Sequence, residues 1–128
     1  MAFRFVLVSA THGGAWAEVL RARLALLGDM DCITQDGIGP EVSQYAMAFV
    51  DSTEVTAPGT CVARLLSGAQ STQVVVLTAS PTWRRAREMF EAGAVDYLSK
   101  SMPQAEFLAA VEAILRRGGE GKGDQDRQ

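Results

Sequence analysis

The sequence contains few of the residues and patterns that define several common classes of protein. It has 2 cysteines and 1 histidine in 128 residues, which excludes a disulfide framework and the ligand spacing of a zinc site. Its net charge of −3 provides no general basic field that would hold nucleic acid. No apolar run approaches the roughly 20 residues that span a bilayer. We therefore expect a cytoplasmic protein that contacts neither nucleic acid nor a membrane directly, with Cys32 and Cys61 as buried thiols.

The composition is that of one globular domain. Hydrophobic residues make up 48% and charged residues 21% of the chain, which is ordinary for soluble proteins, and the length suffices for one well-buried core. The final stretch, EGKGDQDRQ, has no apolar residue. We expect a folded domain over residues 1–117 and a disordered tail or linker over residues 118–128.

The clearest pattern lies between residues 73 and 102, where a strand, a helix and a second strand follow one another. The apolar, mostly β-branched run VVVL ends at Thr78, which is typical of a central parallel strand buried on both faces. A helix opens at Thr82 and closes at Gly93, because glycine accepts the left-handed conformation of a helix cap. The chain then returns to the sheet and carries Lys100 at the end of the second strand.

The same alternation extends over the rest of the chain. Apolar periodicity predicts further strands and helices, with strands over residues 3–8, 30–34 and 45–50 and helices over residues 15–27, 60–66 and 103–117. The segment 35–44 contains two glycines and a proline, so we expect one turn of helix there at most. Alternating strands and helices form a parallel sheet with helices on both faces. Right-handed crossovers then predict a five-stranded, flavodoxin-like α/β fold of strand order 2-1-3-4-5.

This topology brings four strand ends to one crevice, which receives Ser9 or Ala10, Asp51, Thr78 and Lys100. A carboxylate such as Asp51 can act as a nucleophile toward a phosphoryl group. The Thr78 hydroxyl and the Lys100 ammonium can then bind phosphoryl oxygens. The same residues also allow a plainer interpretation, in which Asp51 is a strand-end turn residue and Lys100 forms a structural ion pair with it.

The segments VVVLTAS and EAGAVDYLSKSM, together with Asp51 after AFV, resemble the receiver domains of response regulators (CheY-like). The resemblance covers residues 3–117. It implies that Asp51 accepts a phosphoryl group from a histidine kinase, that Thr78 is the switch hydroxyl and that Lys100 contacts the phosphoryl oxygens. It also implies that Tyr97 is the aromatic residue that changes rotamer, and that a magnesium ion is held beside the phosphoacceptor.

Three departures from the family make this an atypical receiver, or pseudo-receiver. The family has an acidic pair at the end of the first strand, and this position reads Ser9-Ala10 here, so Asp51 would hold Mg²⁺ weakly or not at all. Ser101 follows Lys100 in place of the family's cis proline, which favours a trans bond. The second helix is short.

Two alternatives follow for the role of Asp51. In the first, Asp51 is still phosphorylated, and Glu54, the backbone near Thr53 or a kinase supplies the missing contacts. In the second, the fold is kept as a protein-binding module and no phosphate is involved. In neither alternative is the protein an enzyme in the usual sense, beyond the slow self-dephosphorylation that a working receiver would show in the first. Its expected role is signal reception and relay in a two-component phosphorelay through protein contact.

A basic, aromatic surface is predicted on the helix between the fourth and fifth strands, where Trp83, Arg84, Arg85 and Arg87 lie. Arginine and tryptophan are the residue types that anchor interfaces. In receivers this helix, the fifth strand and the last helix form the output surface, which also serves in homodimers. The alternative is a solvated basic face with a half-buried Trp83.

The loop from Ser9 to Gly14 supports a second function. Its Ser, Thr, His and Gly residues could cradle a phosphate at the start of the following helix. The protein would then be a small-molecule, phosphate or flavin-binding module. The plainer alternative is that His12 is a solvated loop histidine.

Overall fold

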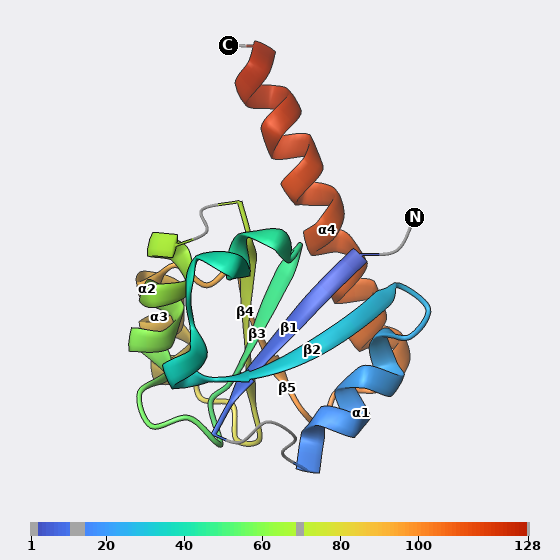
Figure 1. The fold of residues 1–128 in the computed structure, drawn as a ribbon. Coiled ribbons are helices and arrows are strands. Elements are labelled where there is room, and N and C mark those ends of the chain that lie inside the picture. Colours follow the sequence, from blue (N-terminus) through green and yellow to red (C-terminus); the bar gives the residue numbers. More distant parts are fainter. Residues whose placement is uncertain (1–2, 11–14, 69–70, 128) are drawn as a thin grey trace.

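A computed structural model of the protein describes residues 3–10, 15–68 and 71–127, and the side chains of these residues except 15 and 118–127. Five strands form one parallel sheet in the order β2-β1-β3-β4-β5 (Figure 1). They are β1 (Phe3–Ser9), β2 (Gly28–Thr34), β3 (Met47–Asp51), β4 (Gln73–Thr78) and β5 (Asp96–Ser99). The predicted fold class and strand order are therefore confirmed.

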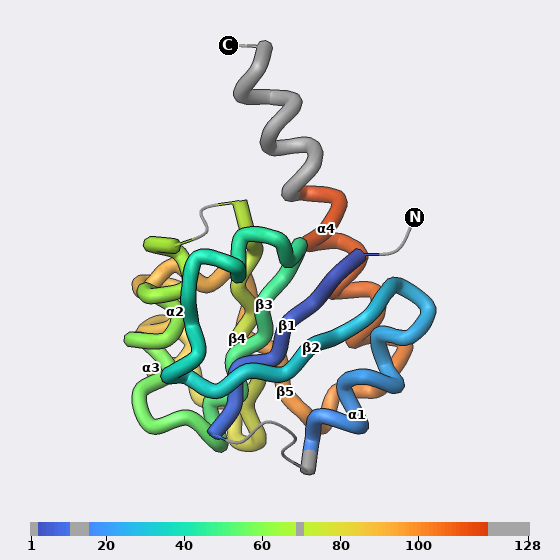
Figure 2. Tube along the Cα trace, viewed as in Figure 1, coloured from blue at the N-terminus to red at the C-terminus, as the bar shows by residue number. Residues whose placement is uncertain are grey.

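Helices cover both faces of the sheet. α1 (Ala15–Leu24) and α4 (Gln104–Arg127) lie on one face, and α2 (Pro58–Gly68) and α3 (Trp83–Ala92) lie on the other, as the ribbon and the tube both show (Figure 1, Figure 2). Alternate residues of each strand face the two layers: in β4, Val74 and Val76 pack toward α2 and α3, whereas Val75 and Leu77 pack toward α1 and α4. Burial on both faces explains why the central strands are continuous apolar runs.

The stretch β4–α3–β5 follows its local sequence signals. The hydroxyl of Thr82 caps α3 by accepting a hydrogen bond from the backbone N–H of Arg85 at 3.2 Å. Gly93 ends the helix at a φ of 115°, a left-handed conformation that L side chains rarely adopt. The described residues contain no cis peptide bond, which agrees with the trans bond predicted after Lys100.

The predicted end of the first helix was wrong. α1 ends at Leu24, and Gly28 begins β2 instead of closing the helix. Gly28 pairs with Phe3 in the sheet, and a Cβ added at Gly28 would collide with the Phe3 backbone. The close approach of two strands therefore decides the residue at this position, and strand pairing overrides the helical periodicity of the preceding segment.

Two other segments differ in detail from the prediction. The segment after β2 forms two short 3₁₀ helices, Gln35–Gly37 and Pro40–Gln44, which confirms that no full second helix is present. α4 continues to Arg127, beyond the predicted end at residue 117. The side chains after Arg117 lie outside the described part, so the boundary between domain and tail stays a prediction.

The two cysteines differ in environment. Cys61 is buried on α2, and burial raises the pKa of its thiol. Cys32 is half-buried on β2, where its sulfur lies 3.6 Å from a guanidinium nitrogen of Arg21, so only one of the two predicted buried thiols is fully buried. Over the described ranges, none of the helices has the length and apolar character to cross a membrane.

Candidate functional site

The structure brings the predicted residues Asp51, Thr78 and Lys100 to the same edge of the sheet. β3 ends at Asp51 and β4 at Thr78, and Lys100 follows the end of β5. The backbone N–H of Lys100 donates to the carbonyl of Thr78 at 2.8 Å, which continues the pairing of these two strands for one more residue. Parallel strands collect their carboxyl ends at one edge, so the sheet order fixes this grouping.

Asp51 and Lys100 form a buried ion pair in which both carboxylate oxygens are engaged. The Lys100 Nζ lies 2.8 Å from Asp51 Oδ1 and 2.9 Å from Oδ2. The Asp51 side chain is 2% exposed and the Lys100 side chain 13%. The backbone N–H of Thr53 also donates to Oδ1 at 3.1 Å. The charge of Asp51 is thus neutralised within the protein, at a place where water contributes little screening.

Trp16 of α1 covers the Lys100 ammonium. The Nζ of Lys100 lies 5.5 Å from the Trp16 ring centroid, and the guanidinium of Arg23 lies 5.5 Å from the same ring, both within cation–π range. Arg23 also donates to the carbonyl of Met102 at 2.8 Å, which holds α1 to the loop after β5. The Trp16 ring packs edge-on against the ring of Phe107 of α4, with 6.3 Å between the two ring centroids.

The involvement of Trp16 was not predicted from the sequence, where this residue is only one position of the helix expected over residues 15–27. No motif links Trp16 to Lys100 along the chain, because their contact depends on how α1 packs against the sheet. The one available signal was its position shortly after the first strand, at the end of the sheet where the site was expected.

Thr78 opens onto a separate hollow beside the ion pair. The hollow has a volume of about 410 Å³ and is lined by Ser52, Thr53, Thr78, Ala79, Ser80, Thr82 and Arg85. Thr78 is 4% exposed, and its hydroxyl accepts a hydrogen bond from the Ser80 backbone N–H at 3.1 Å. Neither Asp51 nor Lys100 lines this hollow. The predicted site residues therefore divide into a closed ion pair and an open polar hollow.

Tyr97 lies half-buried against the core beneath α2 and α3. Its hydroxyl oxygen is buried and has no hydrogen-bond partner among the described residues. A buried polar group without a partner lowers stability by about 1–3 kcal/mol. The inward position of this side chain is thus held by packing of the ring, in spite of its hydroxyl.

Replacing Tyr97 by phenylalanine should therefore raise the free energy of unfolding, by about 1 kcal/mol, because only the unpartnered hydroxyl is lost. The measurement is urea unfolding at neutral pH followed by circular dichroism. Tyr45→Phe is the matched control, because the Tyr45 hydroxyl donates to Asp31 at 2.7 Å.

This control should be destabilising. The Tyr45 hydrogen bond is the main cause that lowers the pKa of Asp31, so its stabilising effect is present at neutral pH and is lost as pH falls through that pKa. A Tyr97→Phe variant that is as destabilised as Tyr45→Phe would contradict the assignment of an unpartnered hydroxyl.

The basic helix α3 presents an aromatic surface. Trp83 is 76% exposed and Phe90 is 47% exposed. The alternative of a half-buried Trp83 is therefore wrong for the isolated chain. Arg87 forms an ion pair with Glu91 at 3.1 Å, whereas Arg85 lines the hollow described above. Arg84 is exposed. The four predicted surface residues therefore lie on one helix but have different neighbours.

The predicted phosphate loop can be assessed only at its start. Thr11, His12, Gly13 and Gly14 lie outside the described residues. Ser9 is 1% exposed at the end of β1. In the described part of the chain, no group of three or more His, Cys, Asp or Glu side chains could hold a metal ion.

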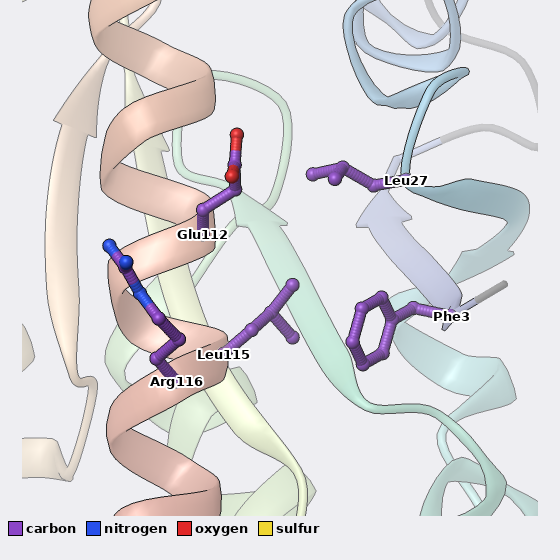
Figure 3. A pocket seen from close by; sticks show the side chains of 5 residues that line it. All are labelled: Phe3, Leu27, Glu112, Leu115 and Arg116. Atoms are coloured by element: carbon purple, nitrogen blue, oxygen red, sulfur yellow. The ribbon is translucent and has the colours of Figure 1, made fainter. Parts of the chain in front are cut away.

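An apolar hollow lies at the opposite end of the sheet, near the start of β1. Phe3, Leu27, Glu112, Leu115 and Arg116 line it, with a volume of about 210 Å³ (Figure 3). Figure 3 shows the side chains of Phe3, Leu27 and Leu115 directed toward the space between α4 and β1. It contains none of the residues that the sequence singled out.

Comparison with known proteins places the fold. The chain is 19% identical to the BeF3-activated receiver domain of DrrB from Thermotoga maritima, with a TM-score of 0.73 over 91% of this chain and 99% of that one. A CheY-like receiver domain protein from Methanospirillum hungatei gives a TM-score of 0.76 at 11% identity, over 94% of this chain and 99% of that one. The chain therefore has the fold of response-regulator receiver domains.

One curated relative has a higher sequence identity to this chain than these structures do, but it is a longer protein. The transcriptional regulatory protein CusR of Escherichia coli K12 is 34% identical over 95 residues, which are 74% of this chain and 36% of CusR. The CusR protein of E. coli O6:H1 matches equally. The chain thus spans about a third of the length of these curated relatives. No family model matches.

Proposed function

We propose that this domain receives and relays a signal in a two-component pathway through protein contact, without phosphorylation of Asp51. The observation that supports this most is the buried pair, in which both oxygens of Asp51 lie within 2.9 Å of Lys100. Attack on a phosphoryl group uses a lone pair of one carboxylate oxygen, and the contacts with Lys100 and with the backbone N–H of Thr53 already engage most of the lone-pair sites of Asp51. Lys100 would have to shift to admit the phosphoryl group, at a site where the Asp51 side chain is 2% exposed and the Trp16 ring lies against the ammonium.

The magnesium ion that the receiver resemblance implies does not fit these residues. Mg²⁺ is usually bound through one or two carboxylates, several waters and phosphate oxygens. Asp51 is the carboxylate at this strand end, and the Lys100 ammonium already neutralises it. Ser9 and Ala10 offer no second carboxylate. We infer that Lys100 takes over the charge balance of the pocket, and that no metal is required as a cofactor.

The partners that we propose are a histidine kinase or another signalling protein. Trp83 and Phe90 expose apolar area on α3 beside the arginines of the same helix, and aromatic residues and arginine are enriched in interface hot spots. The same face is proposed for a homodimer. The protein is proposed to act in the cytoplasm as a binding module, with no catalytic turnover and no direct contact with nucleic acid or membranes.

Incubation with a small phosphodonor and Mg²⁺ tests this function. We expect the intact mass to stay unchanged, because Lys100 contacts both oxygens of Asp51 and Ser9-Ala10 supplies no second carboxylate to hold the Mg²⁺ that would assist the attack. A gain of about 80 daltons that disappears in Asp51→Asn would contradict the proposal. A receiver domain with a complete acidic pair, treated in parallel, shows that the donor is active.

A further inference from the structure

We propose that Arg23 of α1 is a latch that keeps the pair of Asp51 and Lys100 closed, and that its release exposes the Lys100 ammonium. The latch is the hydrogen bond from the Arg23 guanidinium to the carbonyl of Met102, at 2.8 Å. While this bond is made, Trp16 stays over the ammonium. The inference goes beyond the proposed function, because it concerns how the closed pair can be opened and not which partner or signal is relayed.

The Arg23 guanidinium joins three elements of the fold. It lies 5.5 Å from the centroid of the Trp16 ring and 5.2 Å from that of the Phe107 ring, which is within cation–π range of both. It thus links α1 to α4 and, through Met102, to the loop between β5 and α4. No carboxylate of the described residues lies within ion-pair distance of Arg23. The Met102 carbonyl is therefore the acceptor that fixes the guanidinium against this loop.

The loop after β5 forms one hydrogen-bonded turn around Lys100. The backbone N–H of Lys100 donates to the Thr78 carbonyl at 2.8 Å, and that of Met102 donates to the Ser99 carbonyl at 3.1 Å. The backbone N–H of Ser101 also donates to the Ser99 hydroxyl oxygen at 3.2 Å, a bond that a proline at this position could not make. Because the turn is closed in this way, a displacement of Met102 changes the direction in which Lys100 points.

Of the contacts that close the site, the latch is the one that can be released with the smallest loss. The Asp51 side chain is 2% exposed, and separating a buried pair leaves an uncompensated charge. Arg23 is half-buried and its acceptor is a neutral carbonyl, so water can hydrogen-bond to both groups once they part. Release allows α1 to carry Trp16 away from Lys100. A contact made on α1 would in this way reach the end of β4, to which the Lys100 N–H is bonded.

Trace acetylation with acetic anhydride tests the latch on the full, folded chain, with the rate at each lysine measured by mass spectrometry. Arg23→Met removes the guanidinium and keeps an apolar side chain against the two rings. We expect Lys100 to react about tenfold faster, as the loss of a hydrogen bond from a charged group implies. The other lysine of the chain, Lys122, corrects for the amount of reagent.

Arg21→Met is the matched control. Arg21 lies on the same helix, but it pairs with Glu18 at 2.6 Å in an exposed ion pair. Its replacement should change the acetylation rate of Lys100 by less than about twofold. Arg23→Lys keeps a positive charge beside the rings and should give a rate between those of the parent protein and Arg23→Met.

A double variant separates a latch from a general stabilising contact. Trp16→Leu uncovers Lys100 directly, so Arg23→Met should add less than about twofold to the rate in that background. Circular dichroism first shows that each variant is folded, and Arg23→Lys replaces Arg23→Met if the latter is not. Effects that multiply, an unchanged rate at Lys100, or equal increases in the Arg21 and Arg23 variants would overturn the inference. The result is independent of the phosphodonor experiment, because it measures the Lys100 amine and no mass gain on Asp51.

Discussion

Replacing Lys100 by methionine is expected to lower the free energy of unfolding by about 3–5 kcal/mol, because it leaves the buried carboxylate of Asp51 without its partner. The Asp51 side chain is 2% exposed, so water cannot replace the lost contacts without local opening. Methionine keeps a side chain of similar length beside Trp16. The measurement is urea unfolding at neutral pH, followed by circular dichroism and by tryptophan fluorescence.

Two controls separate the loss of the buried pair from the loss of a charge. Arg87→Met breaks an ion pair whose side chains are 66% and 65% exposed, and should cost less than about 1 kcal/mol. The double variant Asp51→Leu/Lys100→Met should recover most of the stability, because apolar replacements of a buried pair are often neutral or stabilising. If Lys100→Met and Arg87→Met lower the free energy of unfolding equally, the ion pair between Asp51 and Lys100 contributes no more to stability than an exposed pair does.

Replacing Trp83 by alanine is expected to weaken association with a partner, or of the domain with itself, by more than tenfold. Trp83 is 76% exposed in the isolated chain, so removal of its side chain should change the free energy of unfolding by less than about 0.5 kcal/mol. Sedimentation over a range of concentrations measures self-association, and pull-down with a histidine kinase measures partner binding.

Leu26→Ala is the matched control for Trp83→Ala. Leu26 is also a highly exposed apolar residue, at 87%, but it lies after α1 rather than on α3. Its replacement should leave both association measurements unchanged. If Trp83→Ala has a sedimentation profile and a pull-down yield equal to those of the parent protein, the interface assigned to α3 is wrong.

The fold was predictable because its signals are local. The β-branched run before Thr78, the cap at Thr82 and the glycine at position 93 each act within a few residues. Alternating strands and helices then leave few topologies, because crossovers in parallel sheets are right-handed. The end of α1 could not be predicted in the same way. Gly28 is required there because it pairs with Phe3, which is distant in the sequence and whose backbone leaves no room for a Cβ.

The sequence predicted which residues meet at the candidate site, but not how their side chains contact one another. Strand ends place Asp51, Thr78 and Lys100 at one edge, and this follows from strand order alone. That Lys100 binds both oxygens of Asp51, and that Trp16 covers the ammonium, depends on the packing of α1. The position of Arg85 at the hollow depends likewise on how α3 packs against the sheet.

The sequence by itself determined the five-stranded parallel sheet and the residues at its carboxyl edge, because periodicity, caps and strand order are encoded over short distances. Only the tertiary structure decided that the carboxylate is closed by an internal ammonium while the neighbouring hollow stays open and positively charged. The physical reason is that burial and ion pairing depend on side chains from distant segments, whose distances are set when the helices pack onto the sheet.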